Sequence, residues 1–128
     1  MEKENIVYQK AYRFAIRIVK VYQFLTEEKK EFVIIKQLLK SSTSIDGNIS
    51  EANGAISKSD FSNIISNSYK ECLETKYWLS LIKVTSFIEK KLFESIYTEA
   101  DEIGKILFSI LKSTLLKRIN HCSLFIGH

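Results

Sequence analysis

The segment from Gln37 to Ala52 constrains the fold more than any other part of the sequence. It has the apolar spacing of a long buried helix, but small and polar residues interrupt the series: Ser41, Ser42, Thr43, Ser44, Gly47, Asn48 and Ser50. Small side chains let helix backbones approach closely, and buried hydroxyl groups need hydrogen-bond partners. We therefore expect this helix to pack tightly in a bundle and to share polar contacts with its neighbours.

The composition favours an all-α protein. The chain has 128 residues, of which 45% are hydrophobic, so one domain with one core is expected. Proline is absent and only four glycines occur, whereas a β-rich chain of this length would need more turn residues. The formal net charge of +4 is compatible with nucleic-acid binding but does not by itself indicate it.

Hydrophobic periodicity and helix-end signals predict four helices. In chain order they run from about Ile6 to Leu25, from Glu27 to Ala52, from the cap Ser57 to Val84, and from the cap Ser86 to Ile119. Thr26 is the expected cap of the second helix. Short connections place successive helices antiparallel. We expect an antiparallel up-down-up-down four-helix bundle over residues 1–119 and a frayed C-terminal tail over residues 120–128.

The first helix is apolar over an unusually large part of its circumference. Six of its residues share one broad face and are expected to point inward: Tyr8, Ala11, Tyr12, Ala15, Val19 and Tyr22. Phe14, Val21 and Phe24 lie outside that face. Because such a helix must bury more than one side, the pattern favours a homo-oligomer, with a generously packed monomer as the alternative.

The same helix carries a one-sided basic stripe. Lys10, Arg13, Arg17 and Lys20 follow a 3-4-3 spacing, which confines them to about 80° of the helix surface. No acidic residue lies between Asn5 and Thr26. Such a stripe can follow a phosphate backbone. The alternatives are an ordinary solvated face or a face paired with acids of a neighbouring subunit.

Four polar residues are expected on the inner pair of helices. Asn48 and Glu51 are three residues apart and share a face, as do Glu71 and Glu74. Two neighbouring carboxylates could support acid–base chemistry, but no nucleophile, metal ligand or substrate-polarising group accompanies them. We expect Asn48, Glu51 and Glu74 to form a buried or half-buried polar network between the second and third helices.

The sequence argues against catalytic and metal centres of familiar kinds. The only histidines, His121 and His128, lie in the predicted tail, so neither a di-metal site nor a histidine-based triad is expected. The isolated glycines form no phosphate-binding loop. Cys72 and Cys122 are expected to be free thiols. Without a secretory signal or a long uncharged apolar stretch, the protein is expected to be cytoplasmic and not membrane-bound.

Three segments carry a resemblance to a known family: VYQKAYRFAIRIVKVY, QLLKSSTSIDGNISEANGAISKSDF and YKECLETKYWLSLI. Over roughly residues 6–117 the chain resembles the 23S rRNA intervening-sequence proteins and, more distantly, the accessory variability proteins of diversity-generating retroelements. The resemblance implies an antiparallel four-helix bundle that assembles as a ring-like homopentamer with a basic surface and has no known enzymatic activity. The retroelement relatives bind nucleic acid and a reverse transcriptase.

The resemblance is clearest in the pattern Q-L-R-R-A-x-x-S-I-x-x-N-I-x-E. Residues of the same types stand at Gln37, Ser44, Ile45, Asn48, Ile49 and Glu51. Glu74 corresponds to the glutamate of the family's third helix. The paired arginines correspond to Leu39 and Lys40, so half of that basic pair is missing here. Asp46 and Gly47 replace the usual Pro-Ala.

These inferences predict a non-enzymatic, homo-oligomeric bundle that acts as a binding or scaffold module. The expected ligand is RNA or DNA, bound through Lys10, Arg13, Arg17, Lys20 and Lys40. The alternative is a protein–protein adaptor whose basic stripe meets an acidic protein partner, with no role in nucleic-acid binding. Neither a metal ion nor a cofactor is expected.

Overall fold

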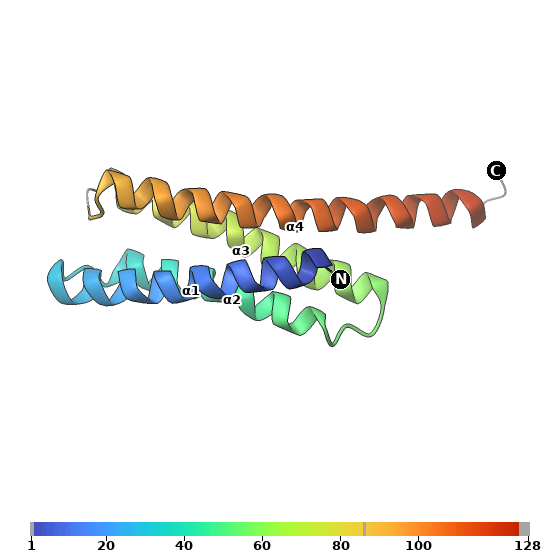
Figure 1. Ribbon diagram of the computed structural model, residues 1–128, viewed down its shortest axis with the longest axis horizontal. Coiled ribbons are helices and arrows are strands. Elements are labelled where there is room, and N and C mark those ends of the chain that lie inside the picture. The colour runs from blue at the N-terminus through green and yellow to red at the C-terminus, as the bar shows by residue number, and fades with distance from the viewer. Residues whose placement is uncertain (1, 86, 126–128) are drawn as a thin grey trace.

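Four helices account for nearly all of the computed structural model, which describes residues 2–85 and 87–125, with side chains described for 3–85 and 87–114 (Figure 1). The helices are α1 (Glu2–Glu28), α2 (Val33–Ala52), α3 (Lys58–Val84) and α4 (Lys90–Phe125). The described residues contain no strand. The prediction of an all-α four-helix bundle is therefore confirmed.

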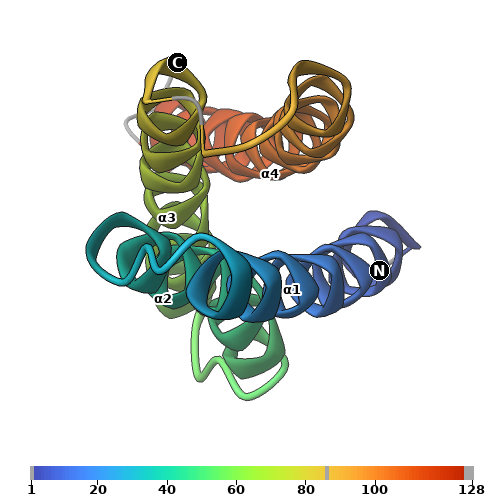
Figure 2. The ribbon, with the colours of Figure 1, turned by 90° about the vertical axis from the view of Figure 1, so that its left-hand side faces the viewer.

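Each helix packs against two others. α1 lies against α2 and α4, and α3 lies against the same two helices from the other side (Figure 2). The C-terminal part of α4 extends past the ends of the other three helices (Figure 1). The short connections between helices make neighbours in sequence neighbours in space.

The core contains buried apolar side chains from all four helices. The largest fully buried ones are Phe14, Ile18, Leu25, Ile35, Leu38, Ile45, Ile65, Leu79, Ile82, Ile96, Ile103 and Leu107. On α3 and α4 the periodic apolar spacing predicts inward positions at Ile65, Leu79, Ile96 and Leu107, among others, and these side chains are buried. The helical periodicity of these two helices thus predicted their inner faces correctly.

On α1 the predicted inner face is only partly correct: Ala11 is buried and Ala15 and Tyr22 are half-buried, but the other three of the six predicted residues are exposed. The buried residues are Val7, Ala11, Phe14, Ile18, Val21 and Leu25, which follow a regular 4-3-4-3-4 spacing. Tyr8, Tyr12 and Val19, which were expected to point inward, are exposed. The side chains that turn inward carry no polar atoms, whereas a buried tyrosine needs a partner for its hydroxyl group.

The junction between α1 and α2 also differs from the prediction. α1 continues through Thr26, whose Oγ1 donates a hydrogen bond to the Tyr22 carbonyl oxygen at 2.8 Å instead of capping the next helix. The chain turns at Lys30, which has a positive φ of 55°. The carboxylate of Glu31 then accepts hydrogen bonds from the backbone amides of Ile34 and Ile35, so it satisfies donors in the first turn of α2.

The ends of α3 agree with the prediction. Ser57 Oγ accepts a hydrogen bond from the Asp60 amide at 3.0 Å, and Asp60 Oδ2 accepts one from the Ile56 amide at 3.1 Å. The expected cap of α4, Ser86, lies outside the described residues. α4 continues past the expected end at Ile119, so residues 120–125 of the predicted tail are helical, and residues 126–128 are not described.

Candidate interaction surfaces

Buried hydroxyl groups join α2 to α3. Ser68 Oγ donates a hydrogen bond to the Ile45 carbonyl oxygen at 2.8 Å, and both side chains are fully buried. Thr75 Oγ1 lies within hydrogen-bonding distance of Ser41 Oγ, at 2.9 Å, in the same interface. The small residues of α2 therefore allow the close approach and the shared polar contacts that the sequence predicts.

The three residues of the predicted polar network are not brought together. Asn48 Nδ2 donates to the Ser44 carbonyl oxygen within α2, at 2.8 Å. Glu51 is exposed, and so is Glu74, whose Oε1 accepts a hydrogen bond from Trp78 Nε1 at 3.2 Å. The hydrogen bonds that cross between α2 and α3 are instead those of the smaller buried hydroxyl groups.

Glu71 lies near the exposed polar residues of α2 and α3. Its pKa is raised, mainly because partial burial disfavours the charged carboxylate and also because Glu74 is close. Lys40 lowers the pKa and offsets part of that rise. A carboxyl group with a raised pKa can serve as an acid or a base, and Lys40 is the cation that lies near it.

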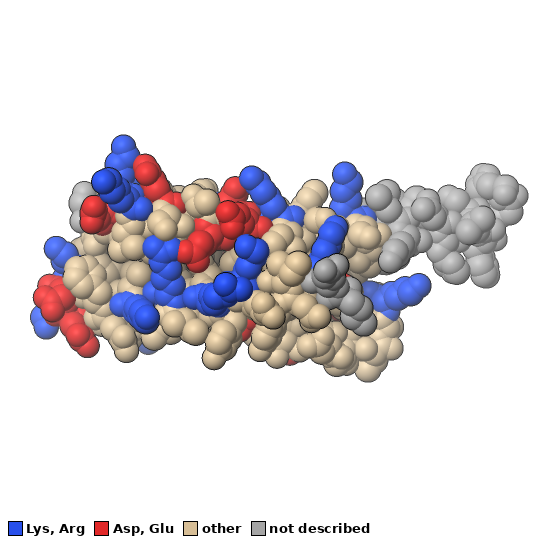
Figure 3. Space-filling model, viewed as in Figure 1, with Lys and Arg blue, Asp and Glu red and all other residues tan. Residues whose placement is uncertain are grey.

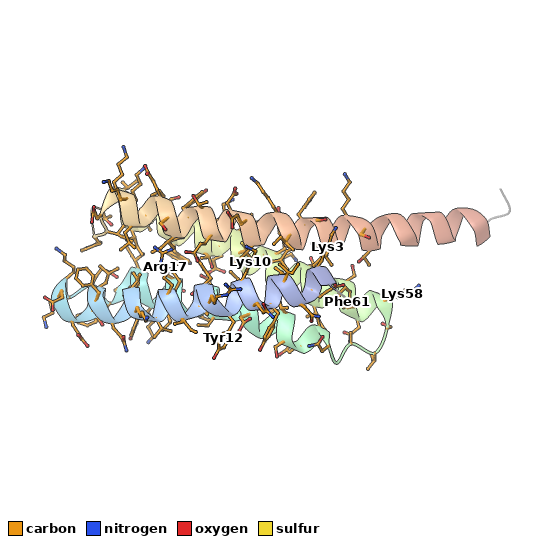
Figure 4. The ribbon with its side chains drawn as sticks, in the orientation of Figure 1. Lys3, Lys10, Tyr12, Arg17, Lys58 and Phe61 are labelled. Atoms are coloured by element: carbon orange, nitrogen blue, oxygen red, sulfur yellow. The ribbon has the colours of Figure 1, made fainter. Side chains whose placement is uncertain are left out.

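Part of the predicted basic stripe holds α1 against α4. Lys10 Nζ lies 3.8 Å from Glu102 Oε2, and Arg17 Nη1 forms an ion pair with Glu99 Oε1. Lys3 Nζ donates a hydrogen bond to Ser109 Oγ at 2.8 Å. Lys3, Lys10 and Arg17 thus follow one line along the seam between α1 and α4 (Figure 4). The spacing of seven residues keeps the three side chains on one side of the helix.

The rest of the predicted cationic set points elsewhere. Arg13, Lys20 and Lys40 are exposed, and none of them forms an ion pair with a side chain that the structure describes. Figure 3 shows basic and acidic groups side by side over the seam between α1 and α4, so charge is largely balanced there. The predicted binding set therefore divides into two paired cations, two uncompensated ones on α1 (Arg13 and Lys20), and Lys40, which lies near Glu71.

An uncharged apolar stripe runs along the outside of α1. We call Tyr8, Tyr12, Ile16 and Val19 the α1 stripe; their side chains are between 37% and 53% exposed. The rings of Tyr8 and Tyr12 lie nearly parallel, with centroids 6.4 Å apart. Most of this stripe was predicted to lie in the core. The hydroxyl groups of its two tyrosines are the sequence feature that favours exposure.

A groove between α3 and α4 forms a second exposed apolar surface. This α3–α4 groove is lined by Tyr69, Cys72, Leu73, Lys76, Asp101, Gly104, Lys105 and Phe108, and its volume is about 290 Å³. The rings of Tyr69 and Phe108 meet across the two helices with centroids 5.8 Å apart. Leu73 and Phe108 are about half exposed. No sequence pattern predicts this groove, since it exists only where two helices meet.

Charges in the groove are paired with one another. Asp101 Oδ1 lies 2.9 Å from Lys76 Nζ, and Asp101 Oδ2 lies 3.2 Å from Lys105 Nζ. The hydrogen bond from Lys76, followed by that from Lys105, lowers the pKa of the Asp101 carboxyl group. The same bond to Asp101 is the main cause of the raised pKa of Lys76. The groove therefore has an apolar lining and a closed polar cluster with one excess positive charge.

The buried thiol beneath the groove has a structural role. Cys72 Sγ donates a hydrogen bond to the Ala100 carbonyl oxygen at 3.1 Å, and burial raises the pKa of the thiol to about 11. A Cβ atom at Gly104 would lie 3.3 Å from that sulfur, so the glycine lets α4 approach α3 closely. A thiol that stays protonated is a poor nucleophile and a poor metal ligand.

The described residues show neither a metal cluster nor a membrane span. Within their side chains, no three His, Cys, Asp or Glu groups gather as metal ligands would, and His121 and His128 lie outside that set. None of the four helices, over residues 2–85 and 87–125, has the length and hydropathy that a membrane crossing needs.

Comparison with known proteins gives two matches that agree with each other. The model of a family described as 23S rRNA-intervening sequence protein matches residues 3–109. A solved structure from Bacteroides thetaiotaomicron, described as a protein with unknown function from the S23 ribosomal protein family, is 48% identical over 86% of this chain and 98% of its own, with a TM-score of 0.85. No curated protein matches the chain. Neither of the two descriptions names an enzymatic activity.

Proposed function

We propose that this chain, which belongs to the 23S rRNA-intervening sequence protein family, is a non-enzymatic homo-oligomeric bundle that binds nucleic acid. The observation that supports binding is the exposure of Arg13, Lys20 and Lys40, none of which forms an ion pair with a described acid, although Lys40 lies near Glu71. Cations of this kind bind phosphate groups and release counterions, with little dependence on base sequence.

The two kinds of cation on α1 have different roles in this proposal. Arg13 and Lys20 contact phosphates, together with Lys40 of α2. Lys10 and Arg17 hold α4 in place through Glu102 and Glu99, and they contribute only indirectly. An ion pair of this partly exposed kind contributes on the order of 0–1 kcal/mol to stability, so its main effect is to orient the two helices.

Self-association is the second part of the proposal. The α1 stripe and the α3–α4 groove leave apolar surface exposed on two parts of one small protein. Contiguous apolar surface of this kind marks an interface between proteins. The family resemblance implies a homopentamer. In any ring, the uncompensated cations would recur in every protomer and bind one nucleic-acid strand with added avidity.

The binding test compares wild type with an Arg13→Glu, Lys20→Glu double variant. The probe is a short fluorescein-labelled RNA, and its anisotropy is titrated between ~50 and ~200 mM salt. Wild-type affinity should fall steeply with salt. The double variant should bind at least tenfold more weakly, and its slope of log affinity against log salt should be smaller by about one to two, because two phosphate contacts are lost.

A matched control keeps the charge change but moves it. Lys58 and Lys91 are exposed and lie at other parts of the bundle, so a Lys58→Glu, Lys91→Glu variant should retain most of the binding. If the wild-type oligomer shows no salt-sensitive affinity for RNA or duplex DNA, binding to nucleic acid is refuted. In that case the same exposed cations would favour the adaptor function, with an acidic protein surface as their partner.

A further inference from the structure

We infer that this protein binds single-stranded nucleic acid, with unpaired bases stacked on Tyr8 and Tyr12 of α1 and backbone phosphates at Arg13 and Lys20. This inference rests on the nucleic-acid binding proposed above and deepens it, because it names the class of strand and assigns its bases to a surface. It uses the tyrosines of the α1 stripe and leaves the α3–α4 groove as the apolar surface for self-association.

Two aromatic rings lie exposed on the outer side of α1. Tyr8 is 37% exposed and Tyr12 is 53% exposed, on a helix whose opposite side belongs to the core. Their rings are nearly parallel, with an interplanar angle of 14° and centroids 6.4 Å apart. Figure 4 shows Tyr12 pointing away from α4. Exposed rings of this kind serve as stacking surfaces for unpaired bases, whichever base is present.

The unpaired cations of α1 lie beside these rings. Arg13 follows Tyr12 in the chain, so their Cα atoms are about 3.8 Å apart, and Lys20 lies about 80° around the helix from Tyr12. Arg13 and Lys20 are about 20° apart around α1 and about 10.5 Å apart along it. A line of cations next to exposed rings fits a single strand, because its phosphates and its bases need different partners.

The other residues on this side of α1 are compatible with the same ligand. Asn5, Gln9 and Gln23 are exposed there and carry no charge. Their amide groups can both donate hydrogen bonds to base edges and accept them. No acidic residue occurs between Asn5 and Thr26, so over that length no side chain of α1 repels a phosphate. The charge of this surface is therefore complementary to a polyanion that carries aromatic bases.

A second aromatic pair shows that exposed rings alone do not define such a site. Tyr77 of α3 is 59% exposed and lies edge to face with Trp78, with centroids 5.0 Å apart. Trp78 Nε1 donates a hydrogen bond to Glu74 Oε1, and the neighbouring cation Lys76 is paired with Asp101. A phosphate at this pair would meet the Glu74 carboxylate. On α1, by contrast, the rings lie beside unpaired cations.

This surface should distinguish single strands from duplexes. In a duplex the bases are paired and stacked inside, so the two tyrosine rings cannot reach a base face and only the cations make contact. Stacking of one base on an aromatic side chain changes affinity by about 5- to 150-fold. The contribution of Tyr8 and Tyr12 should therefore appear with single strands and be absent with duplexes.

The test measures fluorescence anisotropy for wild type and for a Tyr8→Leu, Tyr12→Leu variant. Three fluorescein-labelled DNA probes of about 12 nucleotides are titrated at ~100 mM salt: a single strand, a hairpin duplex, and an abasic strand that keeps its phosphates. DNA represents both kinds of strand, because stacking does not depend on the sugar. Leucine keeps both positions apolar and favours a helix, so the fold should be retained.

The expected result separates stacking from phosphate binding. The leucine variant should bind the single strand at least about fivefold more weakly and the duplex as wild type does. Its slope of log affinity against log salt should be unchanged, since no phosphate contact is lost. Wild type should bind the abasic strand more weakly than the normal strand by a similar factor. A Tyr8→Phe, Tyr12→Phe variant keeps both rings and should bind as wild type does.

The controls separate this inference from the proposal on which it rests. Tyr77→Leu removes an exposed ring from α3 and should leave binding unchanged. If wild type shows no salt-sensitive affinity for any nucleic acid, the proposed function fails. If it does bind, only the stacking inference is overturned by any of four results: the leucine variant loses no affinity for the single strand, it loses affinity for single strand and duplex alike, it changes the mass of the oligomer in light scattering, or the phenylalanine variant loses as much as the leucine variant. Equal affinity of wild type for normal and abasic strands also overturns stacking, and this comparison decides even if a substitution prevents folding.

Discussion

Glu31 is a strong test of the structure, because one carboxylate satisfies two backbone donors at the start of α2. Its Oε1 accepts from the Ile34 amide at 3.1 Å, and its Oε2 accepts from the Ile35 amide at 2.8 Å. Glu31 is only 8% exposed and Ile35 is fully buried. After a change of Glu31→Ala, water could not easily replace the lost carboxylate at the Ile35 amide.

The expected loss of stability follows from these contacts. Removal of a helix N-terminal cap costs about 0.5–2 kcal/mol, and a carboxylate near a helix N-terminus adds about 0.3–1 kcal/mol through the helix dipole. We expect Glu31→Ala to lower the free energy of unfolding by about 1–3 kcal/mol. Glu31→Gln keeps one acceptor oxygen and no charge, so it should lose about half as much.

Urea unfolding followed by circular dichroism measures both changes. All variants are compared at one protein concentration, because association would couple stability to concentration. Glu28→Ala is the matched control: Glu28 is an exposed acid at the end of α1, and its removal should change stability by less than about 0.5 kcal/mol. If Glu31→Ala is as stable as this control, the carboxylate does not cap α2 and the reasoning fails.

Three further predictions concern stability in urea and the reactivity of one buried thiol. Lys30→Gly should stabilise the protein by about 0.5–1 kcal/mol in urea, since Lys30 has a φ of 55° that glycine adopts without strain. Ser68→Ala should lower the free energy of unfolding by about 0.5–1.5 kcal/mol, because it removes a buried hydrogen bond between α3 and α2. Asn48→Ala loses a bond only within α2 and should lower the free energy of unfolding clearly less. Equal losses for the two variants would contradict the geometry. In a Cys122→Ser background, Cys72 should react with iodoacetamide at pH 8 only as fast as the protein unfolds, because its pKa of about 11 leaves roughly a thousandth as thiolate; rapid labelling of the native protein would show an accessible thiol.

α3 was predictable because its local and tertiary signals agree. Ser57 and Asp60 define its start, and the small inward residues Ser68 and Thr75 find partners in α2 as buried hydroxyl groups must. Consistency of this kind is what lets a sequence specify one structure.

The α1–α2 junction was not predictable from its local signals. Thr26 is followed by two glutamates, which is typical of a helix start, yet the chain remains helical there. The carboxylate that accepts from the first-turn amides is that of Glu31, one residue before the N-cap Phe32, and it follows Lys30 in a left-handed conformation. A glutamate is not among the preferred cap residues, and a positive φ at lysine has no signature in the sequence.

The buried face of α1 determines which of its cations lie beside the core and which point to solvent. Once Val7, Phe14 and Val21 are known to be buried, Lys10 and Arg17 must lie beside the core, at the edge that meets α4. Their partners Glu99 and Glu102 are distant in the chain, so no spacing within α1 could reveal them.

Because Tyr8 and Tyr12 were assigned to the core, the predicted inner face of α1 is rotated from the observed one. The prediction therefore missed the exposed α1 stripe and the division of the basic stripe. With the phase corrected, the 3-4-3 spacing of the basic stripe becomes two lines, each with a period of seven residues. One line, with Lys10 and Arg17, is used by the fold, and the other, with Arg13 and Lys20, is free for a ligand. The seven-residue period of the buried residues is therefore the sequence signal that separates the cations paired with α4 from those that remain unpaired among the described side chains.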